Sequence, residues 1–346
     1  MRRLVFLLFA VVVSALGFWK LYSSQNQHIN ASPNSSSLEV FLVPDLAQKS
    51  SNLRKVQISN AQKQVTLFSH DGKSWQVQER YGFPVDMPRL RQLLINLADA
   101  KRLEQKTDDA ERMKSMDLHA EKATHLKLQT ASATILDIFL GNSKNQNSYI
   151  RMADEKAAYR VSNILVASAE PALWLAPEFI SLAAEEIKSM KFIPQAEKAH
   201  SEKAHSEKEF TLLRDKSTKS ISLEKLPWNR DSDQAKLAEP FKALDNLAIV
   251  DVLPISQLTG KPQKFAVTIK NWSDVEIDIK FYDMQPSFLT ISAQYAPEDK
   301  NIAASFAAME QINKINKLGK DWAFRIAPQR ENLLSKRLED MLLAKQ

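Results

Sequence analysis

Hydrophobic and polar positions follow the same order twice along this chain. In each half an alternating segment, which predicts a strand pair, is followed by an Asp and then by a helical apolar stripe. Asp86 begins the first of these helices and Asp233 begins the second. Two more alternating strands follow in each half; their apolar positions are Leu126, Leu128, Leu136, Ile138 and Leu140, and then Val267, Ile269, Ile277, Ile279 and Phe281. The pattern predicts two tandem copies of one unit.

Matching polar positions favour duplication over chance. Asp137 and Asp278 interrupt the same predicted strand in each half, and Tyr159-Arg-Val matches Phe324-Arg-Ile. Apolar periodicity alone would align two such segments only loosely, and it would not place acidic residues at equal positions.

The predicted elements indicate an α+β fold. A helix is predicted for residues 86–104, since Asp86 can accept a hydrogen bond from a first-turn backbone N–H. Pro240 lies inside the second stripe, which predicts a kink or a late start there. Strands are predicted at 124–129, 134–140, 148–152 and 157–161. Their short loops favour antiparallel order, so each copy is expected to be an antiparallel sheet with a helix packed on one face.

Residues 1–22 read as a transmembrane signal-anchor. Arg2 and Arg3 precede an apolar run from Leu4 to Trp19, so the N-terminus is expected in the cytoplasm and the rest of the chain in the periplasm. Val13-Ser14-Ala15 would also serve as a cleavage site, which leaves a cleaved signal as the alternative. The leading expectation is a retained single-pass anchor in the inner membrane.

The remaining chain divides into a tether and two units. Residues 23–40 are rich in Ser and Asn, as in a flexible tether. Residues 41–185 form the first predicted unit and residues 186–346 the second. The second unit contains a low-complexity loop at 196–208, where Glu-Lys-Ala-His-Ser is repeated, and a helical insertion at 295–319. Helical spacing in that insertion is seen at Ile302, Phe306, Met309 and Ile312.

Composition narrows the classes of function. The chain has 6 glycines and no cysteine among 346 residues, which disfavours glycine-rich phosphate loops and excludes disulfides. The formal net charge is +6, but Arg2, Arg3 and Lys20 belong to the anchor region. This balance fits proximity to anionic lipid or a generic surface better than binding to nucleic acid.

No catalytic, cofactor-binding or metal-binding residue can be assigned. Ser222 and Lys225 are three apart on a predicted strand and therefore point to opposite faces. His200 and His205 lie in the repeated loop at a spacing that is not typical of helical metal ligands. His119 and His125 flank the start of a predicted strand and read as surface residues.

Acidic and aromatic residues leave two interpretations open. Alternation puts Asp137 and Asp278 on the sheet face opposite the apolar residues, either as part of an exposed face or as part of an interface. The adjacent acids at Asp108-Asp109 and Glu185-Glu186 read as solvated or helix N-terminal charges. Tryptophans are expected in the cores, with one or two possible partner anchors among Trp75, Trp174, Trp228, Trp272 and Trp322.

Short motifs in the first half resemble a bacterial envelope family, domain of unknown function 4340. The resemblance rests on Gly72-Lys-Ser-Trp75-Gln-Val, Ile138-Phe-Leu-Gly141, Tyr149-Ile-Arg151 and Tyr159-Arg-Val. It implies an N-terminal anchor, a repeated α+β region and genes beside ABC-transporter components of the gliding-motility or auxiliary type. The second copy lacks equivalents of Trp75 and Gly141, and the family brings no catalytic residues.

These observations favour a membrane-anchored periplasmic accessory, scaffold or binding protein without catalytic activity. Its expected partners are the inner membrane, through the N-terminal helix, and a membrane complex such as an ABC transporter. Two alternatives stay open: an envelope enzyme acting on cell-wall glycan or peptide, and a purely structural assembly module. An enzyme would need acids or a nucleophile that converge in a cleft.

Overall fold

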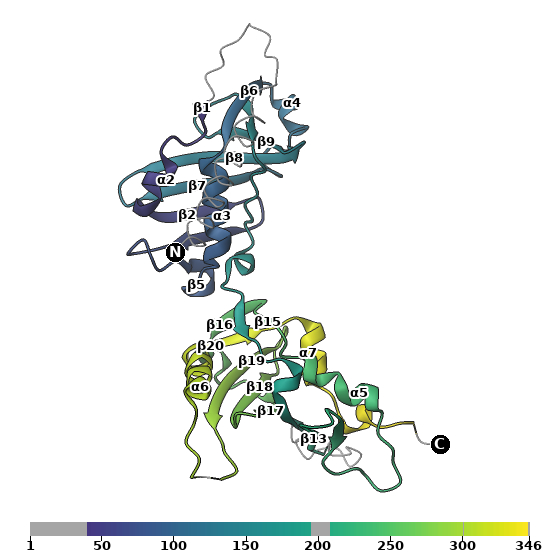
Figure 1. The fold of residues 1–346 in the computed structure, drawn as a ribbon. Helices are drawn as coiled ribbons and strands as arrows, with labels where there is room; N and C mark the ends of the chain where they lie inside the picture. Colours follow the sequence, from purple (N-terminus) through teal and green to yellow (C-terminus); the bar gives the residue numbers. More distant parts are fainter. Residues whose placement is uncertain (1–39, 195–207, 300, 345–346) are drawn as a thin grey trace, which may run out of the picture. The chain divides into compact units, whose positions relative to one another are not determined.

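Two antiparallel sheets with a few helices make up the computed structural model, which describes residues 40–194, 208–299 and 301–344 (Figure 1). The fold class is therefore α+β. The first sheet has the order β1-β6-β10-β9-β8-β7-β2-β3-β4-β5. Its strands are β1 (Val40–Phe41), β2 (Leu53–Ser59), β3 (Gln64–Phe68), β4 (Gln76–Val77), β5 (Phe83–Pro84), β6 (Lys101–Thr107), β7 (Thr124–Thr130), β8 (Thr134–Lys144), β9 (Asn147–Met152) and β10 (Ala158–Ser162).

The second sheet has the order β14-β13-β12-β17-β18-β19-β20-β16. Its strands are β12 (Ile187–Pro194), β13 (Phe210–Arg214), β14 (Ile221–Leu223), β16 (Asp251–Pro254), β17 (Gln263–Asn271), β18 (Val275–Tyr282), β19 (Phe288–Tyr295) and β20 (Trp322–Arg325). A small third sheet pairs β11 (Glu178–Ile180) with β15 (Leu247–Ala248).

The two large sheets share one strand order. Reading from β6 to β4 in the first sheet gives β6-β10-β9-β8-β7-β2-β3-β4. Reading from β16 to β14 in the second sheet gives β16-β20-β19-β18-β17-β12-β13-β14, which is the same order with every strand number raised by ten. Only β1 and β5, at the two edges of the first sheet, have no counterpart in this comparison.

Helix α3 (Met87–Ala98) packs against the apolar face of the first sheet through Leu90, Leu93 and Leu97. The Asp86 carboxylate accepts a hydrogen bond from the Arg89 backbone N–H at 3.1 Å, as its N-cap position predicted. The helix ends at Ala98, however, so the predicted range of 86–104 was too long. Residues 101–107 form β6 instead, because their backbone pairs with both β1 and β10.

The matching helix of the second half is shorter. Asp233 caps α5 (Gln234–Ala238) by accepting from the Ala235 and Lys236 backbone N–H groups. Pro240 then begins a 3-10 turn, because it lacks the N–H that an α-helix needs there. Phe241, which follows it, is fully buried, whereas Leu94 at the matching position of α3 is only half-buried.

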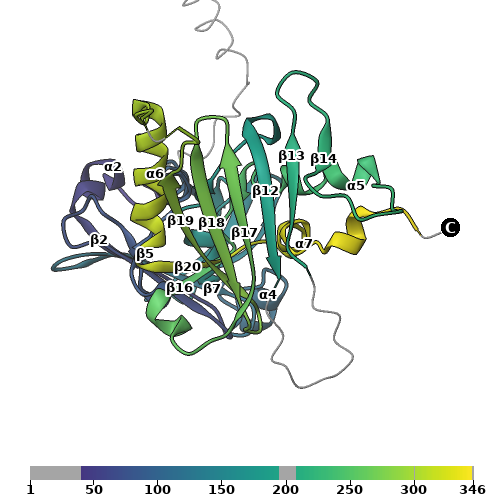
Figure 2. The ribbon, with the colours of Figure 1, turned by 90° about the horizontal axis from the view of Figure 1, so that it is seen from below.

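The helix between β19 and β20 buries only Ile312 of the apolar residues that the sequence indicated there. Helix α6 (Phe306–Gly319) runs along β19, as Figure 2 shows, and buries Ala308, Ile312, Ile315 and Gly319. Ile302, Phe306 and Met309 are exposed. Gly319 permits this packing, since a Cβ at that position would lie 1.9 Å from the Ile291 carbonyl oxygen. The helix therefore turns its smallest residue toward β19.

Short elements complete the second half and the segment before it. A 3-10 turn (Pro171–Trp174) precedes β11. Near the C-terminus, α7 (Pro328–Leu334) is followed by a 3-10 turn (Leu338–Met341).

The predicted strands at 124–129, 134–140, 148–152 and 157–161 correspond to β7, β8, β9 and β10. Alternation places their apolar residues on the face that α3 covers and Asp137 on the other face. Near that outer face lies helix α4 (Ala110–Lys114), followed by Met116. A Cβ on Gly141 would lie 2.0 Å from the Met116 carbonyl oxygen, which gives a physical reason for the glycine in this motif.

The anchor at 1–22, most of the tether at 23–40 and most of the loop at 196–208 lie outside the described residues. Residue 40, at the end of the expected tether, belongs to β1. In the part of the chain that the structure describes, no helix is long and apolar enough to cross a membrane.

Replacing Leu97 by Ala should lower the free energy of unfolding by about 2–5 kcal/mol, because Leu97 is fully buried beneath the first sheet. Ile95→Ala is the matched control on the same helix, since Ile95 is exposed, and should change it by less than about 0.5 kcal/mol. Urea unfolding of both variants measures the difference. Equal losses would show that α3 does not pack as described.

Candidate functional site

The segment between β10 and β12 is hydrogen-bonded to residues of both halves of the chain. On the first side, the Trp174 carbonyl accepts from the Asp86 backbone N–H at 2.7 Å, and Ala176 N–H donates to the Pro84 carbonyl at 3.0 Å. On the second side, β11 pairs with β15, and Leu182 N–H donates to the Leu244 carbonyl at 3.1 Å. This connector is therefore fixed at both ends.

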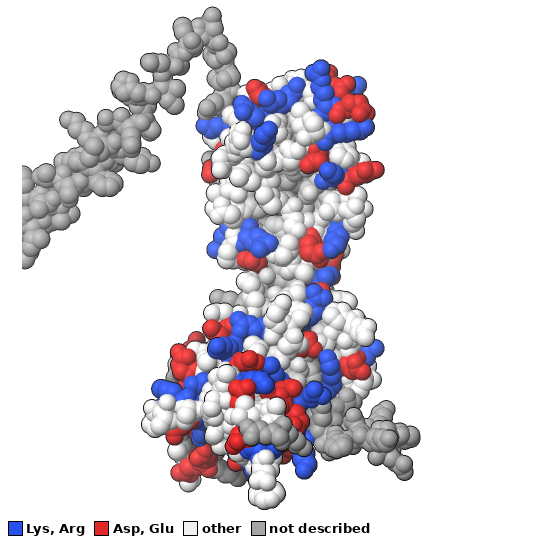
Figure 3. All heavy atoms as spheres, turned by 90° about the vertical axis from the view of Figure 1, so that its right-hand side faces the viewer, with Lys and Arg blue, Asp and Glu red and all other residues white. Residues whose placement is uncertain are grey.

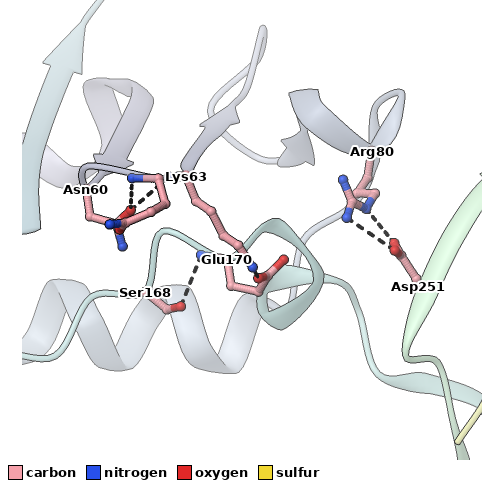
Figure 4. A network of polar contacts seen from close by, with 7 residues as sticks. Asn60, Lys63, Arg80, Ser168, Glu170 and Asp251 are labelled. Atoms are coloured by element: carbon pink, nitrogen blue, oxygen red, sulfur yellow. Dashed lines mark hydrogen bonds and ion pairs between the residues drawn. The ribbon is translucent and has the colours of Figure 1, made fainter.

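An arginine fork joins the two halves directly (Figure 4). Arg80 Nη2 donates to Asp251 Oδ2 at 3.2 Å, and Arg80 Nε donates to Asp251 Oδ1. The two side chains are 23% and 18% exposed. The Val252 backbone N–H also donates to Asp251 Oδ1, so the carboxylate is held by three donors. A planar guanidinium suits this two-point contact, and the partial burial limits screening by solvent.

Aromatic rings form the apolar part of the same junction. Phe83, at the edge of the first sheet, meets Trp322 of β20 edge-to-face with ring centroids 5.1 Å apart. It also meets Phe324 at 6.4 Å. Phe83 and Phe324 are both fully buried. By its contacts the chain from Val40 onward forms one compact unit. We call Arg80, Phe83, Asp251, Trp322 and Phe324 the junction.

A further ion pair fixes the connector to the first sheet. Lys63, in the β2–β3 turn, pairs with Glu170 of the connector (Figure 4). The turn itself is shaped by Asn60, whose Oδ1 accepts from the Lys63 backbone N–H at 2.8 Å. Ser168 Oγ accepts from the Glu170 backbone N–H at 3.1 Å. Local turn chemistry thus positions both members of the ion pair.

The outer face of the first sheet carries a linked polar and aromatic cluster. Asp137 accepts from Lys127 Nζ at 2.8 Å and contacts His125 Nε2 at 2.5 Å. The His125 ring stacks on Phe139 at 4.5 Å, and the Arg151 guanidinium lies 4.4 Å from the same ring centre. Burial raises the pKa of Asp137, but the hydrogen bonds from Lys127 and His125 outweigh burial and hold the pKa below its ordinary value.

The equivalent acid of the second sheet has a simpler environment. Asp278 accepts from the Thr268 hydroxyl at 2.6 Å. Thr268 lies directly opposite Asp278 in the β17–β18 pair, as Lys127 lies opposite Asp137 in the β7–β8 pair. Both acids are therefore on the outer faces, as alternation predicted, and both bond across the strand.

The hairpins that follow β3 and β13 are closed in the same way. Asp71 Oδ1 accepts from the backbone N–H groups two and three residues later, each at 2.8 Å. Asp215 Oδ1 does the same at 2.8 and 2.7 Å. Hydrogen bonds from the Ser74 backbone hold the pKa of Asp71 well below its usual range, and the Ser217 hydroxyl has the same effect on the pKa of Asp215. These two acids are structural closures of the loops.

A pocket of about 270 Å³ lies between α6 and the connector. It is lined by Ile180, Ser181, Ala307, Glu310, Gln311, Lys314 and Ile315. Its polar groups come mainly from one helix face. On the face drawn in Figure 3, cationic and acidic side chains are interspersed.

The structure also places the residues that the sequence brought forward as possible chemistry. Ser222 and Lys225 are exposed near the end of β14. Asp109 caps α4 by accepting from Arg112 N–H at 2.9 Å, and Glu186 accepts from Ala183 N–H at 2.7 Å. Among the described residues no group of three His, Asp or Glu could hold a metal ion, and His200 and His205 lie outside them.

Fewer tryptophans lie in the cores than the sequence indicated, because Trp272 and Trp322 are only half-buried and Trp228 is exposed. Trp75 and Trp174 are buried, and Trp174 Nε1 donates to the Ser168 carbonyl at 2.8 Å. Trp322 belongs to the junction. Trp228 is 89% exposed, on the loop that follows β14.

The comparisons with known proteins give one match. A family model described as a domain of unknown function (DUF4340) matches residues 75–266, more than half of the chain. The match spans the junction residues Phe83 and Asp251, the connector and most of the first sheet. The comparison with curated proteins and the comparison with solved structures each found no match.

The Arg80–Asp251 fork should show measurable coupling. In a double-mutant cycle of Arg80→Met and Asp251→Asn, we expect a coupling energy of about 1–3 kcal/mol, since a shielded charge-assisted fork is lost. Urea unfolding of the four proteins gives this value. The exposed Lys114–Glu111 pair is the control cycle, with an expected coupling below about 0.5 kcal/mol. Equal couplings in both cycles would contradict the assigned junction.

Asp137 should make stability depend on pH in the acid range. Its pKa is lower in the folded chain than in the unfolded chain, so the unfolded chain binds the proton more readily. The resulting stability is complete above about pH 4 and is lost as the pH falls through the folded pKa. Asp137→Asn should therefore reduce the loss of unfolding free energy on acidification. Asp278→Asn is the control at the equivalent position, and an identical effect of both variants would exclude a specific role for the His125–Lys127 contacts.

Proposed function

Because this chain belongs to the family described as domain of unknown function 4340, and because its two sheets are firmly joined, we propose that it is a membrane-anchored periplasmic accessory protein. It acts without catalysis as an adaptor for a membrane complex, of which an ABC transporter is the leading candidate. Residues 1–22 hold it in the inner membrane with the N-terminus in the cytoplasm, and residues 23–39 connect the anchor to β1.

The folded part consists, in this proposal, of two copies of one duplicated unit. The shared strand order of the two sheets supports this. Three acid pairs at equivalent places support it further: Asp71 with Asp215, Asp86 with Asp233, and Asp137 with Asp278. The two acids of each pair have the same local hydrogen-bonding role or the same cross-strand position, although the loops and helices around them differ.

The junction is the observation that carries the adaptor function. Binding a partner with two separate modules costs entropy if the modules first have to be ordered relative to one another. Here the Arg80–Asp251 fork and the buried Phe83 ring fix one sheet against the other before any partner arrives. A partner can then contact both units without that loss.

The two units differ in what they can contact. The outer face of the first sheet presents the His125, Lys127 and Arg151 cluster around Phe139. The second unit adds α6, whose exposed side carries Phe306 and Met309. A duplicated unit with divergent surfaces suits a partner with two different subunits, because each copy can specialise on one of them.

Purification of the full chain from detergent-solubilised membranes tests the proposal. We expect a membrane complex to be recovered in stoichiometric amount with the tagged chain. Arg80→Met should lower that recovery several-fold, since loosening of the junction adds an ordering cost to binding. Lys114→Met, at an exposed pair on α4, is the control and should leave recovery unchanged.

Two outcomes would contradict the proposal. Turnover of cell-wall glycan or peptide by the purified chain would favour an envelope enzyme. Recovery of the chain alone from solubilised membranes, with both variants behaving alike, would favour a structural module without a membrane-complex partner.

A further inference from the structure

Exposed apolar side chains surround the point where the described chain begins. Val40 and Phe41 form β1, the edge strand of the first sheet, and Phe41 is 47% exposed. Just beyond β10, Ile164 is exposed and Val166 is 72% exposed. On α3, Ile95 is exposed as well. We call Val40, Phe41, Ile95, Ile164 and Val166 the β1 surface.

Hydrogen bonds bring these segments together. Phe41 lies opposite Lys101 in the β1–β6 pair, and Lys101 N–H donates to Ser162 Oγ at 2.9 Å. The next residue, Asn163, donates from its side-chain amide to the Asn96 carbonyl of α3 at 3.3 Å. These contacts hold β1, the end of β10 and the last turn of α3 together at one corner of the first sheet.

The exposed side chains are held outward by buried neighbours. Leu165, between Ile164 and Val166, is buried, and its backbone N–H donates to Ser148 Oγ at 2.8 Å. Asn163 has a φ of 70°, in the left-handed region that a turn requires at this point. Burial of Leu165 therefore forces both flanking apolar residues to face solvent.

A cation accompanies the apolar residues. Lys101 Nζ lies 5.4 Å from the centre of the Phe41 ring. Lysine side chains with an aromatic or aliphatic neighbour suit the boundary between lipid headgroups and acyl chains, where the apolar part is buried and the ammonium group stays hydrated. The chemistry of this corner therefore fits a lipid surface.

The point where residues 1–39 join the described chain indicates that a lipid bilayer contacts the β1 surface. Residues 1–39 join the described chain at Val40, within this surface. Only the 17 residues 23–39 separate the anchor from Val40, so the β1 surface cannot lie more than roughly 60 Å from the end of the anchor. The β1 surface then stays close to the bilayer, and this high effective concentration allows a few apolar residues to bind where free association would fail.

We propose that the β1 surface rests on the periplasmic face of the bilayer that holds the anchor. Val166 and Phe41 reach the headgroup region. This contact sets which side of the first sheet faces the membrane and leaves its outer face, with Asp137 and Arg151, available to a protein partner. The inference rests on the proposed function, because it needs the retained anchor.

The absence of cysteine allows a direct test. The full chain carrying Val166→Cys is labelled with an environment-sensitive fluorophore and reconstituted into vesicles of phosphatidylcholine and phosphatidylglycerol. Trp228→Cys, labelled in the same way, is the control, because Trp228 is even more exposed and lies on the second half. We expect headgroup-located nitroxide lipids to quench the Val166 probe several-fold more strongly than the Trp228 probe.

A second variant separates contact from mere proximity. Adding Phe41→Asp to the Val166→Cys chain should reduce quenching to the level of the Trp228 probe, since a carboxylate is unfavourable at the lipid boundary. Ile255→Asp, at an exposed position of the second half, should leave quenching unchanged. Circular dichroism of each variant checks that it is folded.

Flotation of the same samples distinguishes a failure of the membrane anchor from a failure of the proposed lipid contact. If the chain does not float with vesicles, the anchored function itself fails. If it floats but the Val166 and Trp228 probes are quenched equally, only the lipid contact is overturned. A Val166 probe that responds only when a membrane complex is added would also overturn it, because the occupant would then be protein.

Discussion

The fixed position of Phe83 between the two halves is the constraint on which the rest of this molecule depends. The ring belongs to the edge of the first sheet, yet it is buried against Trp322 and Phe324 of the second. Full burial of such a ring is worth about 1.5–3 kcal/mol, and the Arg80–Asp251 fork adds direction to it. Either contact alone would allow one sheet to rotate relative to the other. Together, an apolar contact and a two-point polar contact define one arrangement of the two sheets.

Within that frame the two halves tolerate different helices because they keep the same strands. Pairing between neighbouring strands is determined by backbone hydrogen bonds, which side-chain divergence does not remove. The helical covers are more easily changed: Pro240 shortens the helix after Asp233, and α6 is inserted between β19 and β20. Gly319 lets α6 approach β19 closely and cover apolar sheet surface. The second half therefore combines the same strand order with an additional helix.

The sequence predicted the strands well because alternation is a local signal. Examples are the strands from β7 to β10 and the caps at Asp86 and Asp233, because each of these signals depends on only a few neighbouring residues. The end of α3 was missed, because the preference of residues 101–107 for a strand comes from pairing with β1 and β10 rather than from their own pattern. Most of the buried face of α6 was also missed, since Phe306 and Met309 face solvent and a glycine that permits close packing does not register in an apolar stripe.

The polar contacts were harder to foresee for two reasons. Arg80 and Asp251 are far apart in sequence, so no spacing rule connects them. His125 and Asp137 belong to neighbouring strands, but the register shifts near Leu128, and His125 reaches Asp137 diagonally rather than from the opposite position. Because of the register shift, counting back from the hairpin turn would place Leu126, and not Lys127, opposite Asp137. A one-residue shift of this kind is invisible to alternation, although it decides which side chains meet.

The proposed adaptor function requires a firm attachment where residues 1–39 join the folded chain, and the start of the described chain has the contacts for one. Strand β1 pairs with β6 over only two residues, which would fray if it stood alone. Directly after it, however, Leu42, Val43 and Leu46 are buried in the core, and Leu42 N–H donates to the Ala100 carbonyl at 2.7 Å. Tension from the N-terminal side would therefore pass into the core beside α3, and from there through the junction to the second sheet. Rigidity at Phe83 and attachment at Leu42 are thus two parts of one requirement of the proposal, because an anchor could determine the position of both halves only if neither link yields.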